Sequence, residues 1–165
     1  LGGLEKDGKT GRISTEPENH DLMNHLRFEK VARIEVPDLE VIGDRDDADL
    51  LIVGFGSTYG HLLTTMHELQ ARGHKVALVQ FKYINPLPKN AADVLLKYKK
   101  VVVAEQNLGQ LAALLRIRIN HFSPYQYNKV KGQPFVVSEL VDGFEKILCA
   151  PECGNSAKTF EGNII

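Results

Sequence analysis

The sequence predicts an α/β fold with a mainly parallel sheet, because short apolar strands alternate with helical patterns at even spacing. The strands are expected to begin near residues 48, 75 and 100. Strand–helix–strand units of this length form crossovers that leave neighbouring strands parallel. Helices should therefore cover both faces of the sheet, which gives a domain of three layers.

Each predicted strand is a nearly continuous apolar run of the kind found in strands buried on both faces. The runs lie at 48–54, 75–81 and 100–105. A short extended piece around 127–130 could add another strand. The domain should therefore hold its core on both sides of one central sheet.

Two helices are predicted from apolar residues at helical spacing between the strands. The first contains Leu62, Met66 and Leu69, and Gly73 stands where a C-terminal cap belongs. Pro88 is expected to open the second, which continues through Ala92, Leu95 and Leu96.

Two more helices are predicted in the second half of the chain. Apolar residues keep helical spacing over 108–122, for nearly four turns. Ser138 is expected to cap a final helix that closes the domain. The apolar face of that helix should consist of Val141, Phe144 and Leu148, or else of Leu140 and Ile147.

The chain divides into three segments by composition. Residues 1–37 are expected to form an interdomain linker and a charged helix that starts at Pro17, has a thin apolar stripe with Leu22 and Leu26, and ends before Pro37. Residues 38–148 should form the α/β domain, and 149–165 a tail without clear periodicity. Because the chain begins with Leu1 and not Met, we expect a fragment or a processed product.

Composition and charge exclude several classes of function. The 165 residues include 20 Lys+Arg and 21 Asp+Glu, a formal net charge of -1 that disfavours a nucleic-acid binder. No apolar run approaches the ~20 residues that span a bilayer, and the start lacks a signal-peptide core. We expect a cytoplasmic protein that binds neither nucleic acid nor membrane.

A glycine-rich turn follows the first predicted strand, with Gly54, Gly56, Ser57, Thr58 and Gly60. A strand-to-helix turn of this kind can present free backbone N–H groups to an anion. The spacing GxGxxxG differs from the dinucleotide fingerprint, and there is no GK[ST] of a phosphate-binding loop. We favour a structural turn capped by Ser57 or Thr58 over an anion site.

A second polar turn follows the third predicted strand and contains Glu105, Asn107, Gly109 and Gln110. Ligands and partners usually dock at the carboxyl ends of strands in open α/β sheets, which gives these residues a possible role in binding. The structural alternative is that Asn107 caps the next helix and Glu105 accepts from the helix amides. We favour the structural interpretation here as well.

The sequence does not predict a metal site or a catalytic group. His20 and His25 are spaced unlike two ligands on one helical face, and His67 begins an HExxH-like run that lacks the second histidine. Cys149 and Cys153 form CxxxC, which is too little for an iron–sulfur cluster, and are expected to be free thiols.

The order of several motifs resembles the C-terminal domain of the alpha subunit of 2-oxoacid:ferredoxin oxidoreductases. The motifs are residues 50–58, 73–77, 86–88, 102–107, 109–111 and 132–135. Residues 3–11 and 17–20 look like the segment that joins the preceding domain in the 2-oxoglutarate type. One departure is Phe55, where the family pattern leads us to expect tryptophan.

The resemblance implies a transketolase C-terminal-like fold, with a five-stranded, mostly parallel sheet and one antiparallel edge strand. It further implies an enzyme that converts a 2-oxoacid, with 2-oxoglutarate first, and coenzyme A to acyl-CoA, CO2 and reduced ferredoxin. Thiamine diphosphate, magnesium and an iron–sulfur cluster would be bound by the beta subunit and the remainder of the alpha subunit. This chain would be non-catalytic and inactive by itself.

Two alternatives remain open at this stage. The chain could be a stand-alone module that binds an anion or nucleotide at the turn containing Gly54, or a domain of a pyruvate-type oxidoreductase. If the chain is instead the oxidoreductase domain that it resembles, the two polar turns, 54–60 and 105–110, should face substrate, coenzyme A or a partner subunit.

Overall fold

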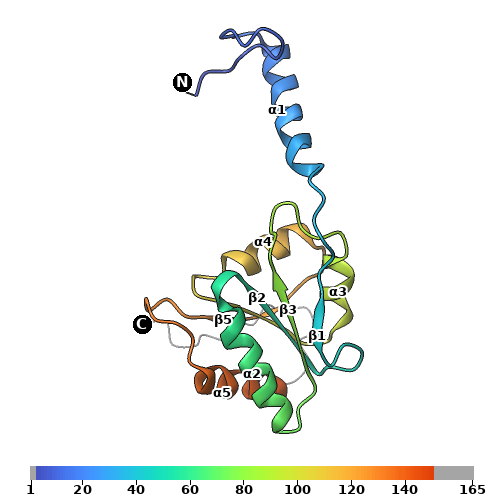
Figure 1. Ribbon diagram of the computed structural model, residues 1–165, viewed down its shortest axis with the longest axis vertical. Helices are drawn as coiled ribbons and strands as arrows, with labels where there is room; N and C mark the ends of the chain where they lie inside the picture. Colours follow the sequence, from blue (N-terminus) through green and yellow to red (C-terminus); the bar gives the residue numbers. More distant parts are fainter. Residues whose placement is uncertain (1–2, 151–165) are drawn as a thin grey trace. The chain divides into compact units, whose positions relative to one another are not determined.

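The computed structural model describes residues 3–150, which form two compact units (Figure 1). One unit consists of 38–82 together with the chain from residue 88 onward. The other consists of the segment up to residue 37 together with 83–87. The predicted tail beyond residue 150, including Cys153, lies outside the described residues.

A five-stranded sheet forms the centre of the larger unit. Its strands, in spatial order, are β1 (Val41–Gly43), β3 (Val76–Phe81), β2 (Leu50–Phe55), β4 (Val101–Glu105) and β5 (Tyr125–Asn128). Val53 of β2 lies opposite Val79 of β3 and Val103 of β4. β1 pairs antiparallel with β3, and all other pairs are parallel. The predicted parallel sheet with one antiparallel edge strand is confirmed.

Helices cover both faces of this sheet (Figure 1). One face packs against α2 (Tyr59–Ala71) and α5 (Val137–Cys149), whose apolar side chains share a core with alternate strand residues such as Leu50 and Ile52. The intervening residues, such as Leu51 and Val53, are also fully buried and face the other side, where α3 (Ala91–Lys97) and α4 (Gln110–Arg118) lie. The expected three layers are present.

The edge strand β1 is short, and polar side chains hold its two ends in place. Asp44 follows the strand, and its Oδ2 accepts from the backbone N of Val76 at 3.0 Å and from Nε2 of Gln70 at 2.9 Å. Before the strand, Asn90 donates to the carbonyl of Leu39 and accepts from its N–H, at 3.0 and 2.8 Å. These contacts compensate for a strand of only 3 residues.

Helix α3 begins later than the sequence predicts. Pro88 does not open it, because residues 88–90 form a turn in which the carbonyl of Pro88 accepts from the N–H of Ala91 at 3.0 Å. The side chain of Asn90, the residue before the helix, bonds to Leu39 and makes no cap.

Helix α4 is shorter than predicted, and α5 lacks the predicted cap. α4 ends at Arg118, after which Ile119 is extended and His121 adopts a positive φ of 64°. Ile119 and Phe122 are buried although they lie outside the helix, so their helical spacing in the sequence results from burial and not from helical structure. Ser138 lies inside α5, which follows Val136 in extended conformation and has no side-chain cap.

The smaller unit is built on the predicted charged helix, α1 (Pro17–Ala32). The loop before it returns on itself through a bridge between Lys6 and Ile13. Glu5 then accepts from both terminal nitrogens of Arg27, at 3.1 and 3.0 Å, and lies 3.2 Å from Nδ1 of His20. The hydrogen bonds from Arg27 lower the pKa of Glu5 from 4.5 to about 2.

The contact of Glu5 with α1 should weaken as the pH falls. Because its pKa is depressed in the folded unit, the contribution of this contact to stability is fully present above pH 4.5 and is lost as pH falls toward 2. An NMR titration of the Glu5 carboxyl carbon should give a pKa near 2, and Arg27→Ala should raise it toward 4.5. The control is Lys30→Ala on the same helix, and a wild-type pKa near 4.5 would contradict the contact.

Candidate functional site

The two turns singled out in the sequence lie at the same edge of the sheet. Residues 54–60 follow β2, and 105–110 follow β4, its parallel neighbour. The carboxyl ends of parallel strands lie at the same edge, where open α/β sheets usually bind ligands or partners. The structure therefore places both predicted turns at this edge, the first with Gly54, Gly56, Ser57, Thr58 and Gly60 and the second with Glu105, Asn107, Gly109 and Gln110.

The first turn is closed by tight packing around Gly54. A Cβ on Gly54 would overlap Cδ1 of Leu62 and lie 2.5 Å from Oε1 of Gln80. Gly56 adopts a φ of 67°, a conformation that disfavours other residues. The chain then forms a single 3₁₀ turn, η1 (Gly56–Thr58), before α2 begins. Glycine at position 54 thus lets α2 pack directly onto β2.

The predicted side-chain cap of α2 is wrong. The hydroxyl of Thr58 is buried and donates to the carbonyl of Phe55 at 3.0 Å, so it satisfies the end of β2 and makes no cap bond. Ser57 is exposed. The 3₁₀ turn leads directly into α2, which begins without a capping side chain.

Gln80, which no sequence motif indicated, also supports the first turn. Its Nε2 donates to the carbonyl of Gly56 at 2.9 Å, which fixes the orientation of the amide. Its Oε1 is buried beside Gly54 and has no hydrogen-bond partner among the described residues. A ligand that binds at this place would have to donate a hydrogen bond to the buried acceptor, which disfavours an anion. The only sequence signal was a polar residue near the end of an apolar strand.

The second turn is held by a buried carboxylate. Glu105 is 4% exposed; its Oε2 accepts from the backbone N of Leu111 at 2.6 Å and its Oε1 from that of Ala112 at 2.9 Å. A negative charge at a helix N-terminus is favourable, and hydrogen bonds to charged groups are the stronger ones. The structural interpretation of Glu105 is confirmed.

Asn107 bonds to the start of α4, but it is not the predicted cap residue, because Gly109 is the N-cap and no side chain makes the cap bond. Its Oδ1 accepts from the backbone N of Gly109 at 2.8 Å and from that of Gln110 at 2.9 Å. Gly109 adopts a φ of 92° immediately before the helix. The N–H groups at this helix end, those of residues 109–112, all have acceptors within the chain, which removes the donors that an anion would need.

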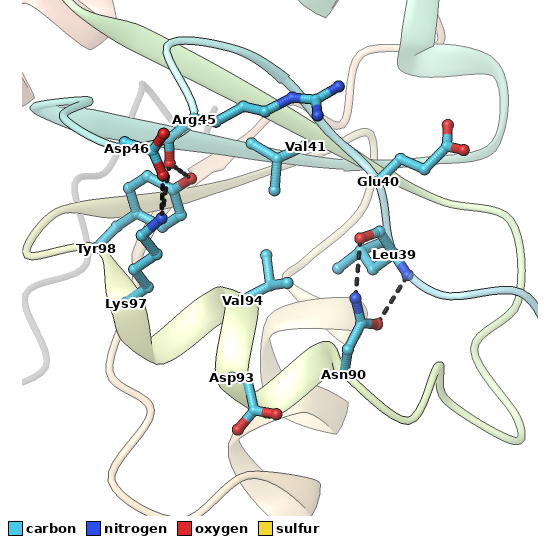
Figure 2. Close-up of a pocket in the computed structure, with 10 residues that line it drawn as sticks. All are labelled: Leu39, Glu40, Val41, Arg45, Asp46, Asn90, Asp93, Val94, Lys97 and Tyr98. Carbon is cyan, nitrogen blue, oxygen red and sulfur yellow. Dashed lines mark hydrogen bonds and ion pairs between the residues drawn. The ribbon is translucent and has the colours of Figure 1, made fainter.

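A cleft of about 580 Å³ lies elsewhere, between β1, the loop after it and α3 (Figure 2). Val41 and Val94 point into it from opposite sides. Many of its polar groups are engaged: Lys97 pairs with Asp46 at 2.9 Å, and the hydroxyl of Tyr98 donates to the carbonyl of Arg45 at 2.6 Å. Burial raises the pKa of Tyr98, so it stays a donor at neutral pH. No predicted site residue lines this cleft.

The described residues hold no group of three or more His, Cys, Asp or Glu side chains placed to bind a metal ion. Cys149, at the end of α5, is an exposed free thiol. No helix in the described part of the chain is long and apolar enough to cross a membrane.

Replacing Glu105 by Gln should destabilise the domain by about 1–3 kcal/mol, because the amide loses one acceptor and turns an N–H toward a helix N–H. Unfolding in denaturant, followed by circular dichroism, measures the change. Gln110→Ala, at an exposed position beside the turn, should stay within about 0.5 kcal/mol. Equal stability of Glu105→Gln and the wild type would show that the carboxylate is dispensable.

Alanine at two glycines of the first turn should have opposite effects. Gly54→Ala should cost about 1–3 kcal/mol, because the new methyl meets Leu62 and Gln80. Gly60→Ala should stabilise by about 0.5–1 kcal/mol, because Gly60 is helical and its Cβ would meet nothing within 4 Å. Thermal melts of both variants test this, and loss of stability in Gly60→Ala would contradict the open space there.

Curated relatives of this chain are subunits of 2-oxoacid oxidoreductases. The chain is 46% identical over 140 residues to the 2-oxoglutarate oxidoreductase subunit KorA of Mycobacterium tuberculosis, a match that covers 85% of this chain and 21% of the relative. It is 31% identical over 152 residues to subunit alpha of 2-oxoacid:ferredoxin oxidoreductase 2 of Aeropyrum pernix, covering 88% and 24%. The chain therefore spans about a fifth to a quarter of their length.

Solved structures agree with this relationship. The 2-oxoglutarate:ferredoxin oxidoreductase of Magnetococcus marinus, solved with 2-oxoglutarate, coenzyme A and succinyl-CoA bound, matches 88% of this chain and 26% of its own with a TM-score of 0.77 and 32% identity. A split-gene transketolase, an inactive beta4 tetramer, matches 70% of this chain and 43% of its own with a TM-score of 0.51 and 19% identity, a likeness of fold alone.

The family model described as "Pyruvate:ferredoxin oxidoreductase core domain II" matches residues 48–139. This range holds more than half of the chain and includes β2 to β5 and both polar turns. The chain belongs to the pyruvate:ferredoxin oxidoreductase core domain II family.

Proposed function

We propose that this chain is the non-catalytic C-terminal part of the alpha subunit of a cytoplasmic 2-oxoglutarate:ferredoxin oxidoreductase. The assembled enzyme converts 2-oxoglutarate and coenzyme A to succinyl-CoA, CO2 and reduced ferredoxin, with thiamine diphosphate as cofactor. The observation that carries this proposal is the 46% identity to a 2-oxoglutarate oxidoreductase subunit over 85% of the chain. The isolated chain is expected to be inactive.

The described residues do not fit thiamine diphosphate, its magnesium ion or an iron–sulfur cluster. The amides at the start of α4 are occupied by Glu105 and Asn107, and the buried acceptor of Gln80 faces the other turn. The described part of the chain also lacks a group of metal-binding side chains. We therefore assign these groups to the beta subunit and to the rest of the alpha subunit.

The role of this chain in the enzyme is to pack against a partner subunit through the two turns at the sheet edge. Phe55 and Leu108 are 41% and 71% exposed beside backbone groups that are already satisfied. A surface of exposed apolar side chains around satisfied polar groups suits a protein interface better than a small-anion site. Ferredoxin would meet the chain only through the assembled complex.

A charged side chain in this surface should weaken assembly of the enzyme. In the complete alpha subunit, Leu108→Asp is expected to reduce affinity for the beta subunit at least about tenfold, because an unpaired charge would be buried at the interface. Ile117→Asp, a change at a position of α4 that is 79% exposed, is the matched control and should leave assembly intact. Analytical ultracentrifugation of the mixed subunits measures the effect.

The same complexes test the reaction. Ferredoxin reduction in the presence of coenzyme A should be faster with 2-oxoglutarate than with pyruvate in terms of kcat/KM. A higher kcat/KM with pyruvate would identify the enzyme as the pyruvate type.

Two further outcomes concern the role of this chain. Full assembly of the Leu108→Asp variant with the beta subunit would contradict the proposed interface. Micromolar binding of a nucleotide to the isolated chain, lost in Gly56→Val, would favour the stand-alone module instead.

A further inference from the structure

Helix α1 differs from the other helices of the described residues because none of its 16 residues is buried. In contrast, α2, α3, α4 and α5 each bury at least two residues. In proteins most of the stability of a helix comes from packing of its apolar face rather than from helix propensity. Within its own unit the helix therefore lacks the buried apolar contacts that normally stabilise one.

One side of α1 is already used by its own loop. Asn19 donates to the carbonyl of Lys6 at 3.0 Å, and Arg27 donates to Glu5. Gly8 approaches Met23 on the same side, since a Cβ there would lie 3.1 Å from Sδ. These contacts hold the loop against the helix without burying any helical residue.

An apolar stripe remains open on α1 beside the loop. It consists of Leu22 and Leu26, one turn apart and 52% and 42% exposed. Charged residues border it, with Glu18 and Glu29 among them on the helix. An apolar centre with a charged rim is the usual composition of an interface.

We infer that the Leu22–Leu26 stripe docks on a part of the alpha polypeptide that lies outside this chain. This inference rests on the proposed function. Residues 38–165 make up less than four-fifths of the chain, so the 88% covered by the Aeropyrum pernix relative must extend into 1–37. That relative is matched over only 24% of its own length, which leaves most of its polypeptide to supply the docking surface.

Hydrogen exchange measured by mass spectrometry tests the inference on three samples: the 165-residue chain, the complete alpha subunit and its complex with the beta subunit. Amides of α1 should exchange at least about tenfold more slowly in the complete alpha subunit than in the 165-residue chain. Amides of α5, which is packed within its own domain and lies outside both polar turns, should be equally protected in all three samples.

Paired variants of the complete alpha subunit locate the contact. Leu22→Asp combined with Leu26→Asp should return α1 to fast exchange. Phe28→Asp, also a change of an exposed apolar residue, at 68% exposure, lies on the other side of the helix and should leave the protection unchanged. The opposite result for the two variants would overturn the assignment of the docking face.

Each other occupant gives a distinct result that would overturn the inference. Protection already present in the 165-residue chain would mean contact with its own α/β domain, or with a second copy if it rises with concentration. Protection that appears only with the beta subunit would make that subunit the occupant. Ferredoxin reduction by the complex is measured separately, so a failure of this inference is distinguishable from a failure of the proposed function.

Discussion

The hydrogen bonds of the buried Glu105 carboxylate determine the arrangement at the carboxyl edge of the sheet. Glu105 ends β4, and its two oxygens accept from the first turn of α4, while its backbone carbonyl accepts from the N–H of Lys129 after β5. One residue thus joins two strands and a helix. Because a buried charge without partners is costly, these bonds fix where α4 begins and how it leaves the sheet.

This arrangement has a consequence for function, because helix amides that bond to the chain itself are lost to a ligand. In many α/β proteins the first amides of a helix at this edge bind phosphate. Here Glu105 and Asn107 occupy them, and at the neighbouring turn the packing of Leu62 against Gly54 leaves no space around that glycine. At the start of α4, the position where many α/β proteins bind a ligand is therefore used for contacts within the chain.

Local patterns predicted the parts of the fold that depend on residues close in sequence. The apolar runs located β2, β3 and β4, and the role of Glu105 followed from its position before a helix. Features that depend on distant residues were missed. β1 is a strand because Asp44 and Asn90 bond across the fold, and Gln80 supports a turn 24 residues earlier. Ile119 and Phe122 were predicted to be helical from their spacing, but they lie after the end of α4 and are spaced in this way because both are buried.

The chain carries two kinds of surface that are available for interaction. Polar groups at the sheet edge are mostly satisfied within the domain, so what remains to interact there is apolar surface such as Leu108. Within its own unit α1 contacts only its loop and buries none of its residues, so it gains little stability from packing there. A domain whose polar groups are hydrogen-bonded and whose apolar side chains are exposed is stabilised mainly by association with a partner that buries those side chains. That physical constraint, together with the family, favours a role in assembly over a role in chemistry.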